Sequence, residues 1–280
     1  MGPNTAKKGT DPMIQNVVQD FCIDFDGGQV LCRTDVPEVG TFISKMFSAM
    51  LVPHADNQIG QIELLRSVGG FTLNGGESLN DEGDPSGVFD QLRHEVLMTF
   101  ILARRDLIWL HAGVVKRGGG ATLISGPSGA GKSTLTTILC ERGWQFLSDD
   151  AAPLSVTTMD VLPYPQTPRR RVYHARELSS GDEHLLEREM RPVPAERVWR
   201  GRSPVAQIVF IEFSFDARAE LRPATPGETT LGLISNCTNF VDHKADGVAC
   251  LAALARSAPG YVLKYGDNAA AAALIDGLAI

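Results

Sequence analysis

Apolar residues recur along the chain at two spacings, which predict alternating strands and helices over its C-terminal part. From Val88 to Ile101 they stand about four positions apart, a helical spacing, and Asp84-Pro85-Ser86 just before them suits a helix start. Short apolar runs bounded by Gly, Pro or polar residues are typical of strands. We expect such strands at residues 107–116, 121–125, 145–147, 152–157, 205–213, 217–222 and 261–265. We expect further helices at residues 133–142, 226–235, 245–257 and 268–278.

The N-terminal part has its own pattern, which predicts a small separate lobe. We expect, in order, a hairpin at residues 13–33, a helix at 38–51 and two short strands at 59–73. Residues 74–87 are rich in Gly, Asn, Asp and Glu, which indicates a mobile loop and a domain boundary. The expected organisation is a disordered tail at 1–12, a small α+β region at 13–85 and an α/β core at 86–280.

Composition and charge narrow the classes of function. Hydrophobic residues make up 43% and charged residues 21% of 280 residues, as in globular proteins. No apolar run approaches the ~18 residues of a membrane helix, and residues 1–12 lack the apolar stretch of a secretory signal. The net charge of −7 disfavours nonspecific nucleic-acid binding. Five cysteines without C-x-x-C spacing indicate a reducing compartment and no zinc site. We therefore expect a cytoplasmic protein with neither nucleic-acid nor membrane partners.

One segment carries the strongest chemical prediction. It has the pattern G-x-x-x-x-G-K-[ST] of a phosphate-binding loop, followed by a second hydroxyl residue: Gly126, Pro127, Ser128, Gly129, Ala130, Gly131, Lys132, Ser133 and Thr134. The glycines let backbone N–H groups face phosphate oxygens, the lysine adds positive charge, and the serine hydroxyl can ligate Mg²⁺. A strand is expected before this loop and a helix after it, so the positive helix end would face the phosphates. The loop predicts a nucleoside triphosphate and Mg²⁺ as ligands. The expected fold class is α/β: a P-loop core of mixed sheet with flanking helices, plus the small α+β lobe.

Three polar residues near the loop are candidates for catalysis. Asp149 and Asp150 follow a short predicted strand, at the edge where ligands gather in open α/β sheets. Adjacent carboxylates on extended chain point in different directions, so one could ligate Mg²⁺ while the other accepts a proton. The alternative is a turn with Asx capping. His111 lies in the apolar segment before the loop strand, where it is either a core residue or a contact for the γ-phosphate.

An arginine-rich segment offers candidate substrate contacts. Residues 169–202 hold nine Arg against six acidic residues in an otherwise acidic chain. Arg169, Arg170 and Arg171 could clamp a phosphate or an acidic peptide terminus, because guanidinium pairs bidentately with such groups. The alternative is a solvated surface with Glu/Arg pairs at helical spacing.

The order of these motifs resembles that of a known kinase family. The segment 110–114 with its histidine, the loop, Arg142-Gly143-Trp144 and the aspartate pair follow one another as in HPr kinase/phosphorylase. The sequence resembles more closely the HPr-kinase-related kinases of peptide-modification clusters, including lasso-peptide precursor kinases, and residues 251–266 share this resemblance. It implies an HPr-kinase-like core and an ATP-dependent serine kinase that acts on a peptide or protein. The second signature of the true HPr kinase/phosphorylases is not recognisable in residues 163–171. HPr as substrate, the reverse reaction and homo-oligomeric assembly therefore stay open.

The resemblance also implies a role for each matching residue. Lys132 would hold the phosphates and Ser133 the Mg²⁺. Asp149 would be the catalytic base, Asp150 its metal-side or phosphate-side partner, and His111 a residue near the transferred phosphoryl group.

Other nucleotide-binding families share the loop but lack support elsewhere in the chain. There is no L-S-G-G-Q signature of an ABC ATPase, and no N-K-x-D motif of a GTPase. A small-molecule kinase stays open, because the loop and the aspartates do not identify the acceptor. A nucleotide-binding sensor without catalysis stays open as well.

Overall fold

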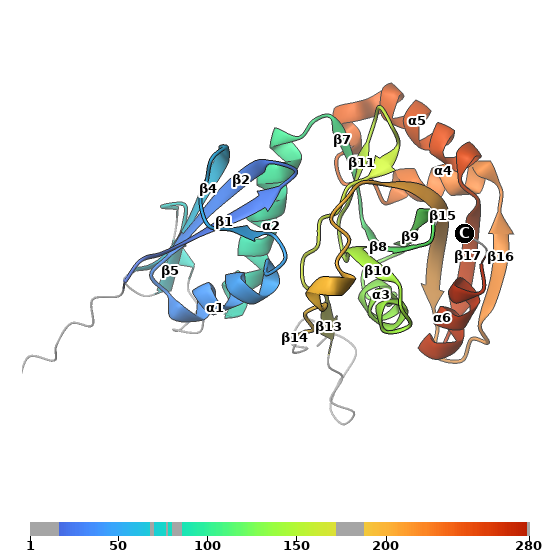
Figure 1. The fold of residues 1–280 in the computed structure, drawn as a ribbon, viewed down its shortest axis with the longest axis horizontal. Helices are drawn as coiled ribbons and strands as arrows, with labels where there is room; N and C mark the ends of the chain where they lie inside the picture. Colours follow the sequence, from blue (N-terminus) through green and yellow to red (C-terminus); the bar gives the residue numbers. More distant parts are fainter. Residues whose placement is uncertain (1–16, 68–69, 77, 80–85, 172–187, 279–280) are drawn as a thin grey trace, which may run out of the picture.

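The N-terminal part of the chain forms a mixed sheet covered by two helices (Figure 1). The computed structural model describes residues 17–67, 70–76, 78–79, 86–171 and 188–278; the expected tail at 1–12 and part of the expected loop at 74–87 lie outside them. The strand order is β3-β1-β2-β4-β5-β6. The bounds are β1 (Gln19–Phe25), β2 (Gly28–Thr34), α1 (Pro37–Met46), β3 (Leu51–Val52), β4 (Gln58–Ser67), β5 (Gly70–Leu73), β6 (Ser78–Leu79) and α2 (Ser86–Ala103). The predicted hairpin and pair of strands are confirmed within the described residues, whereas the helix expected at 38–51 ends at Met46 and residue 51 begins β3.

The helix α2 packs on this N-terminal sheet, with Val96 and Phe100 buried in the same apolar core as Ile23 and Ile62. The domain boundary expected after residue 85 stays a prediction. Aromatic rings continue this core toward the second sheet. The ring centroid of Phe25 lies 5.2 Å from that of Trp109 and 5.4 Å from that of Tyr164. Burial of each such side chain stabilises the fold by roughly 1.5–3 kcal/mol. These ring contacts therefore connect the N-terminal part with the second sheet.

The rest of the chain is built on a second, larger mixed sheet. Its strands follow the order β10-β8-β9-β15-β12-β11-β7, with β17 beside β15 and β16 beside β17. The bounds are β7 (Leu107–Leu110), β8 (Ala112–Arg117), β9 (Gly120–Ser125), β10 (Gln145–Ser148), β11 (Ala152–Ser155), β12 (Asp160–Val161), β15 (Ser203–Phe213), β16 (Glu220–Ala224) and β17 (Gly260–Tyr265). A small ribbon consists of β13 (Arg169–Arg171) and β14 (Arg188–Met190). The mixed α/β fold expected from the sequence is confirmed.

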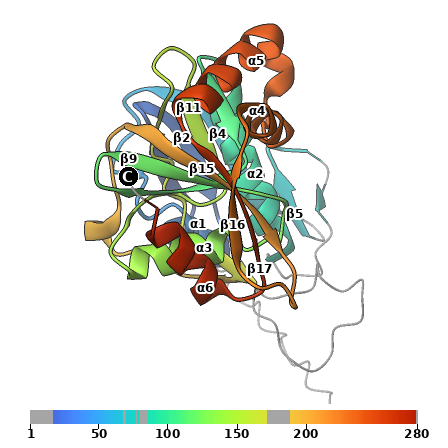
Figure 2. The same cartoon turned by 90° about the vertical axis from the view of Figure 1, so that its right-hand side faces the viewer.

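Helices cover both faces of the second sheet (Figure 2). Their bounds are α3 (Lys132–Glu141), α4 (Pro226–Ser235), α5 (Phe240–Ser257) and α6 (Asn268–Asp276), and a short 3₁₀ turn is η2 (Ala195–Arg197). Leu135 and Leu139 of α3 pack with Ile275 of α6 on one face, while Leu233 of α4 and Leu251 of α5 are buried on the other. Among the described residues, no helix combines the length and apolarity needed to cross a membrane.

The single strand expected at residues 107–116 is wrong, because the chain breaks at His111 between β7 and β8. β7 pairs with β11, whereas β8 pairs with β9 and β10. The backbone N–H of His111 donates instead to the Asn236 carbonyl at 2.7 Å, and its carbonyl accepts the Ser125 hydroxyl at 3.1 Å. These contacts with a distant turn interrupt the ladder and place His111 at the edge of the sheet.

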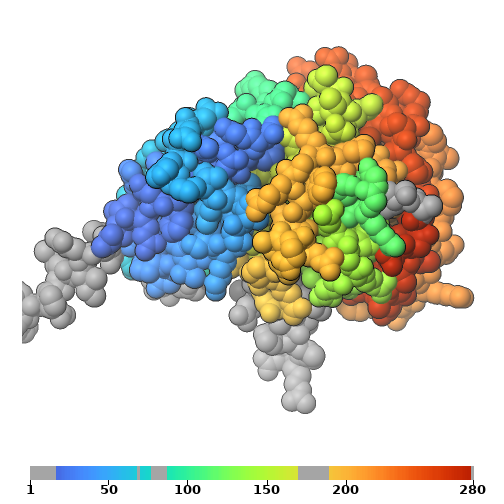
Figure 3. All heavy atoms as spheres, viewed as in Figure 1, coloured from blue at the N-terminus to red at the C-terminus, as the bar shows by residue number. Residues whose placement is uncertain are grey.

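The segment after β14 connects the two parts of the molecule. In the space-filling view it lies between the N-terminal sheet and the region of α3 (Figure 3). Arg200 donates to the Ala49 carbonyl at 3.1 Å, and Arg202 pairs with Asp26 at 3.2 Å. The backbone N–H of Trp199 donates to the Phe146 carbonyl of β10 at 2.8 Å. The segment therefore contacts the N-terminal part through its arginines and the second sheet through the Trp199 backbone.

Candidate active site

Several strands of the second sheet end at the same edge. β9, β15 and β17 are parallel neighbours. β8 is antiparallel to both β9 and β10, so β10 runs in the same direction as β9. Polar and aromatic residues follow the carboxyl ends of all four strands, which is where open α/β sheets bind ligands. His111 precedes β8 and so reaches this edge as well.

The predicted phosphate-binding loop connects β9 to α3. Gly129 and Gly131 have φ values of 82° and 100°, a left-handed region that other residues rarely adopt. A Cβ at Gly126 would lie 2.7 Å from the Ile211 carbonyl oxygen, so only glycine fits there against β15. The α3 helix begins at Lys132, and the N–H groups of its first turn have no partners within the helix. The loop therefore has a backbone shape and a helix end suited to an anion.

Lys132 is buried beneath the loop with its ammonium held by loop carbonyls. Its Nζ donates to the Gly126 oxygen at 2.7 Å and to the Pro127 oxygen at 3.1 Å. Burial lowers the pKa of Lys132, and the nearby Asp150 and Asp149 oppose that shift. These carbonyls keep a positive charge next to the loop amides.

Tyr265, the last residue of β17, anchors the same loop. Its hydroxyl donates to the Ala130 carbonyl at 2.6 Å, and the side chain is fully buried. A Cβ added to Gly131 would overlap this hydroxyl. The loop conformation thus depends on a contact between segments that are far apart in the sequence.

Asp149 lies deep beside the loop and faces the start of α3. Its carboxylate accepts the Ser133 hydroxyl at 2.9 Å and the Thr136 hydroxyl at 3.3 Å, and only 5% of the residue is exposed. Burial and the neighbouring Asp150 raise the pKa of Asp149 to about 6, despite the Ser133 hydrogen bond and the Arg93 charge. Asp149 is therefore hydrogen-bonded to Ser133, the residue whose hydroxyl the sequence predicts as a ligand of Mg²⁺.

Asp150 points away from Asp149, toward Arg93 and His111. The Arg93 Nη1 atom donates to Asp150 Oδ2 at 2.9 Å, and His111 Nδ1 lies 3.2 Å from Asp150 Oδ1. Burial alone would raise the pKa of Asp150, but Arg93, His111 and Lys132 outweigh it and hold that pKa below its usual range. Burial lowers the pKa of His111, against the opposing effect of Asp150, and its Nδ1 atom also lies 3.1 Å from the Asp150 backbone carbonyl oxygen. Asp150 is consequently a charged group at the wall of the site.

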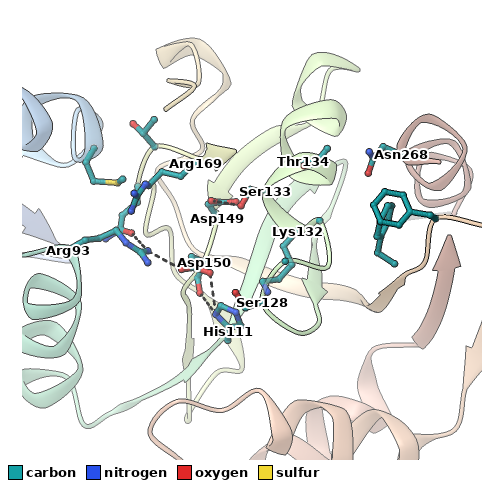
Figure 4. Close-up of a pocket in the computed structure, with 17 residues that line it drawn as sticks. Arg93, His111, Ser128, Lys132, Ser133, Thr134, Asp149, Asp150, Arg169 and Asn268 are labelled. Atoms are coloured by element: carbon teal, nitrogen blue, oxygen red, sulfur yellow. Dashed lines mark hydrogen bonds and ion pairs between the residues drawn. The ribbon is translucent and has the colours of Figure 1, made fainter. Parts of the chain in front are cut away.

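These groups line one pocket of about 710 Å³ (Figure 4). Asp150, Arg93 and His111 lie on one side of Lys132, and Asn268 lies on the other. Gln166, which accepts from Arg93 at 3.4 Å, and Met46 of α1 line the first side. The pocket therefore has two ends that meet at the loop, and one end is bordered by the N-terminal part.

The arginine candidates fall on the strand β13, near the same pocket. Arg169 lines it, forms an ion pair with Asp90 of α2, and lies with its guanidinium 6.0 Å from the Phe42 ring centroid. The side chains of Arg170 and Arg171 lie outside the described residues. A role for these arginines in binding substrate stays a prediction.

The residues present fit a nucleoside triphosphate with its metal ion. Ser133 supplies a hydroxyl and Asp149 a carboxylate within hydrogen-bond distance of each other, both hard oxygen ligands of the kind Mg²⁺ prefers. Within the described residues no group of three His, Cys, Asp or Glu side chains could hold a metal alone. Mg²⁺ usually takes only one or two protein carboxylates and completes its shell with phosphates and water, so this small donor set suits it.

Sequence reasoning missed several residues of the pocket. Arg93 lies on α2, which the apolar spacing predicts as a helix. No nearby residue in the sequence indicates that Arg93 pairs with Asp150. Phe215 and Asn268 of the pocket follow strands whose order in the sheet the sequence does not specify, and so does Tyr265, which anchors the loop from beneath at the end of β17. Their position after apolar strands was the one available indication.

Comparison with known proteins gives little further information. No protein-family model matches the chain, and no curated protein matches it. Among solved structures, it is similar to the Hpr(Ser) kinase/phosphatase from Coxiella burnetii, with a TM-score of 0.32 and 14% sequence identity. That similarity covers 60% of this chain and 91% of the other. The resemblance found in the sequence motifs therefore stays a prediction.

Proposed function

We propose that this protein is a P-loop kinase that transfers the γ-phosphoryl group of ATP to a hydroxyl group. One observation carries the proposal: the loop lysine, the Ser133–Asp149 pair and the Asp150–His111–Arg93 group line a single pocket. Phosphoryl transfer requires a phosphate cradle, a metal site and a group that orients the acceptor. The three sets of side chains correspond to these three requirements.

Ser133 and Asp149 form the metal side of the site. The hydroxyl and carboxylate oxygens would hold Mg²⁺, which when bound neutralises charge on the β- and γ-phosphates. The Ser133 hydroxyl donates to one Asp149 oxygen, and the Thr136 hydroxyl lies 3.3 Å from the other. Lys132 would place its ammonium on the phosphates in exchange for the loop carbonyls.

Asp150 is our candidate for the acceptor side. Asp149 is buried, whereas 32% of the Asp150 side chain is exposed, so Asp150 is the more accessible of the two carboxylates. Arg93 keeps Asp150 ionised, so the carboxylate can accept a hydrogen bond from an incoming hydroxyl and orient it for attack. This division reverses the one expected from the sequence, in which Asp149 was the base and Asp150 the metal-side residue.

We propose a serine of a peptide or protein as the acceptor, in line with the motif resemblance. The acceptor end of the pocket is framed by Met46 and Arg93 of the N-terminal part and by Gln166 of the core. An acceptor would enter between these parts. Most of the rate enhancement would come from positioning and charge stabilisation.

Mass spectrometry of candidate acceptors tests the proposal. Peptides encoded beside the gene, and a panel of small alcohols, are incubated with ATP, Mg²⁺ and either the wild type or the Lys132→Ala variant. A phosphoryl mass gain on a peptide with the wild type alone supports the proposal. A gain on small alcohols alone would instead identify a small-molecule kinase. ATP binding without any phosphorylated product would indicate a sensor.

A further inference from the structure

The end of the pocket away from the aspartates has a different character. Along the sheet edge the order is β10, β8, β9, β15 and β17. The aspartates follow β10, the phosphate-binding loop follows β9, and Phe213 and Phe215 lie at and just beyond the end of β15. Asn268 follows β17. If the acceptor occupies the aspartate end, the nucleoside must extend toward these aromatic and amide side chains.

Phe215 is the most exposed large apolar residue among those described, at 84% of its surface. Its ring packs edge-on against Phe213, with centroids 5.0 Å apart, and Phe213 packs in turn against Tyr265 at 5.4 Å. Tyr265 is the residue that anchors the loop through Ala130. The exposed ring is thus linked to the phosphate-binding loop through two buried or half-buried rings.

The backbone that carries Phe215 is fixed. The Ser214 N–H donates to the Tyr265 carbonyl at 2.9 Å, and the Ala217 N–H donates to the Ser214 carbonyl at 2.9 Å. A Cβ at Gly266 would lie 2.5 Å from the Phe215 carbonyl oxygen and 2.6 Å from that of Ser214, so the turn rests directly on a glycine. An exposed aromatic ring on such a supported turn costs little to order when a ligand stacks on it.

Asn268 supplies polar groups at the same end. A Cβ added to Gly131 would lie 3.9 Å from Asn268 Oδ1, so this amide lies beside the loop. Among the described residues, no hydrogen bond engages the Asn268 side chain. Thr134, the hydroxyl residue after the metal-binding serine, lines the pocket between the loop and this amide. An amide offers both a donor and an acceptor to a partner.

We propose that Phe215 is the stacking platform for the nucleobase of the bound triphosphate and that Asn268 hydrogen-bonds its polar edge. The inference rests on the proposed nucleotide-binding function and names the part of the pocket that binds the nucleoside. Every base has a π-face, so stacking tolerates different bases, and one amide can adapt to either purine. ATP and GTP should therefore bind with similar affinity.

Equilibrium binding of ATP and of inorganic tripolyphosphate tests this platform, because tripolyphosphate has the phosphates without the base. Phe215→Ala should weaken ATP binding by roughly 5- to 150-fold, as for loss of a base–aromatic stack. It should leave tripolyphosphate binding unchanged, and Phe215→Tyr should restore ATP affinity. Leu231→Ala on α4 is the matched control, because Leu231 is 67% exposed but lines neither pocket of this region.

The outcomes separate the two proposals. Wild-type protein that binds neither compound would overturn the proposed function and this inference with it. Wild-type protein that binds ATP, together with a Phe215→Ala variant of unchanged ATP affinity, would overturn the platform alone. Equal weakening of ATP and tripolyphosphate by Phe215→Ala would also overturn it, since the side chain would then act through the loop.

Discussion

The two adjacent aspartates should affect stability in opposite ways. Asp149 is enclosed, and its pKa rises from an ordinary 3.8 to about 6 in the folded protein. The folded state thus binds a proton that the unfolded chain releases, so this group's favourable contribution is lost as pH rises from about 4 through 6. A shift of about 2 units corresponds to about 3 kcal/mol, a large part of a typical stability of 5–15 kcal/mol.

Asp149→Asn removes that charge and keeps one oxygen to accept the Ser133 hydroxyl, while the amide NH₂ takes the place of the oxygen near Thr136. We expect the variant to gain up to about 3 kcal/mol over the wild type above pH 7, and the gain to shrink to near zero at pH 4. Urea unfolding of the nucleotide-free protein at several pH values measures the difference.

Asp150→Asn is the matched control. The pKa of Asp150 is held low by Arg93, so its charge stabilises the fold at neutral pH and is lost as pH falls. This variant should therefore be less stable than the wild type at pH 7. A stability of Asp149→Asn below that of the wild type at every pH would refute the reasoning about the buried carboxylate.

Two further changes test the geometry of the site. Gly131→Ala places a Cβ against the Tyr265 hydroxyl at a φ of 100°, so we expect a loss of roughly 1–3 kcal/mol in stability, measured by thermal unfolding, together with weakened ATP binding; normal ATP affinity would show that the loop shape is unimportant. Arg93→Gln removes the cation that lowers the pKa of Asp150, so the acid limb of the pH–rate profile for phosphoryl transfer should move to higher pH while ATP affinity stays unchanged. An unmoved limb would argue against Asp150 as the group on the acceptor side.

The sequence predicts those parts of the site whose functional residues lie within a few positions of one another along the chain. The loop from Gly126 to Ser133 and the pair Asp149-Asp150 each carry their chemistry within a few positions, and the strands and helix around them have strong apolar patterns. The structure places these segments at one pocket, as a common sheet edge implies.

The rest depends on contacts that local patterns do not encode. The apolar run around His111 predicts an unbroken strand, but the turn at Asn236 takes the His111 N–H and ends β7 there. The directions of the two aspartates follow from Ser133 on one side and Arg93 on the other, and Arg93 comes from a helix that packs on a different sheet. The sequence predicts that both carboxylates lie at the site. Their hydrogen-bond partners, Ser133 for Asp149 and Arg93 for Asp150, determine which of them suits the metal side and which the acceptor side.

Calorimetric titration with ATP and Mg²⁺ tests the central claim most directly, because it requires no knowledge of the acceptor. The account predicts that the wild-type protein binds ATP at one site per chain. Lys132→Ala should weaken this binding at least about tenfold, as for loss of a charge-assisted contact to phosphate, without loss of the fold. A wild-type protein that binds no nucleoside triphosphate, or a Lys132→Ala variant with undiminished affinity, would contradict it.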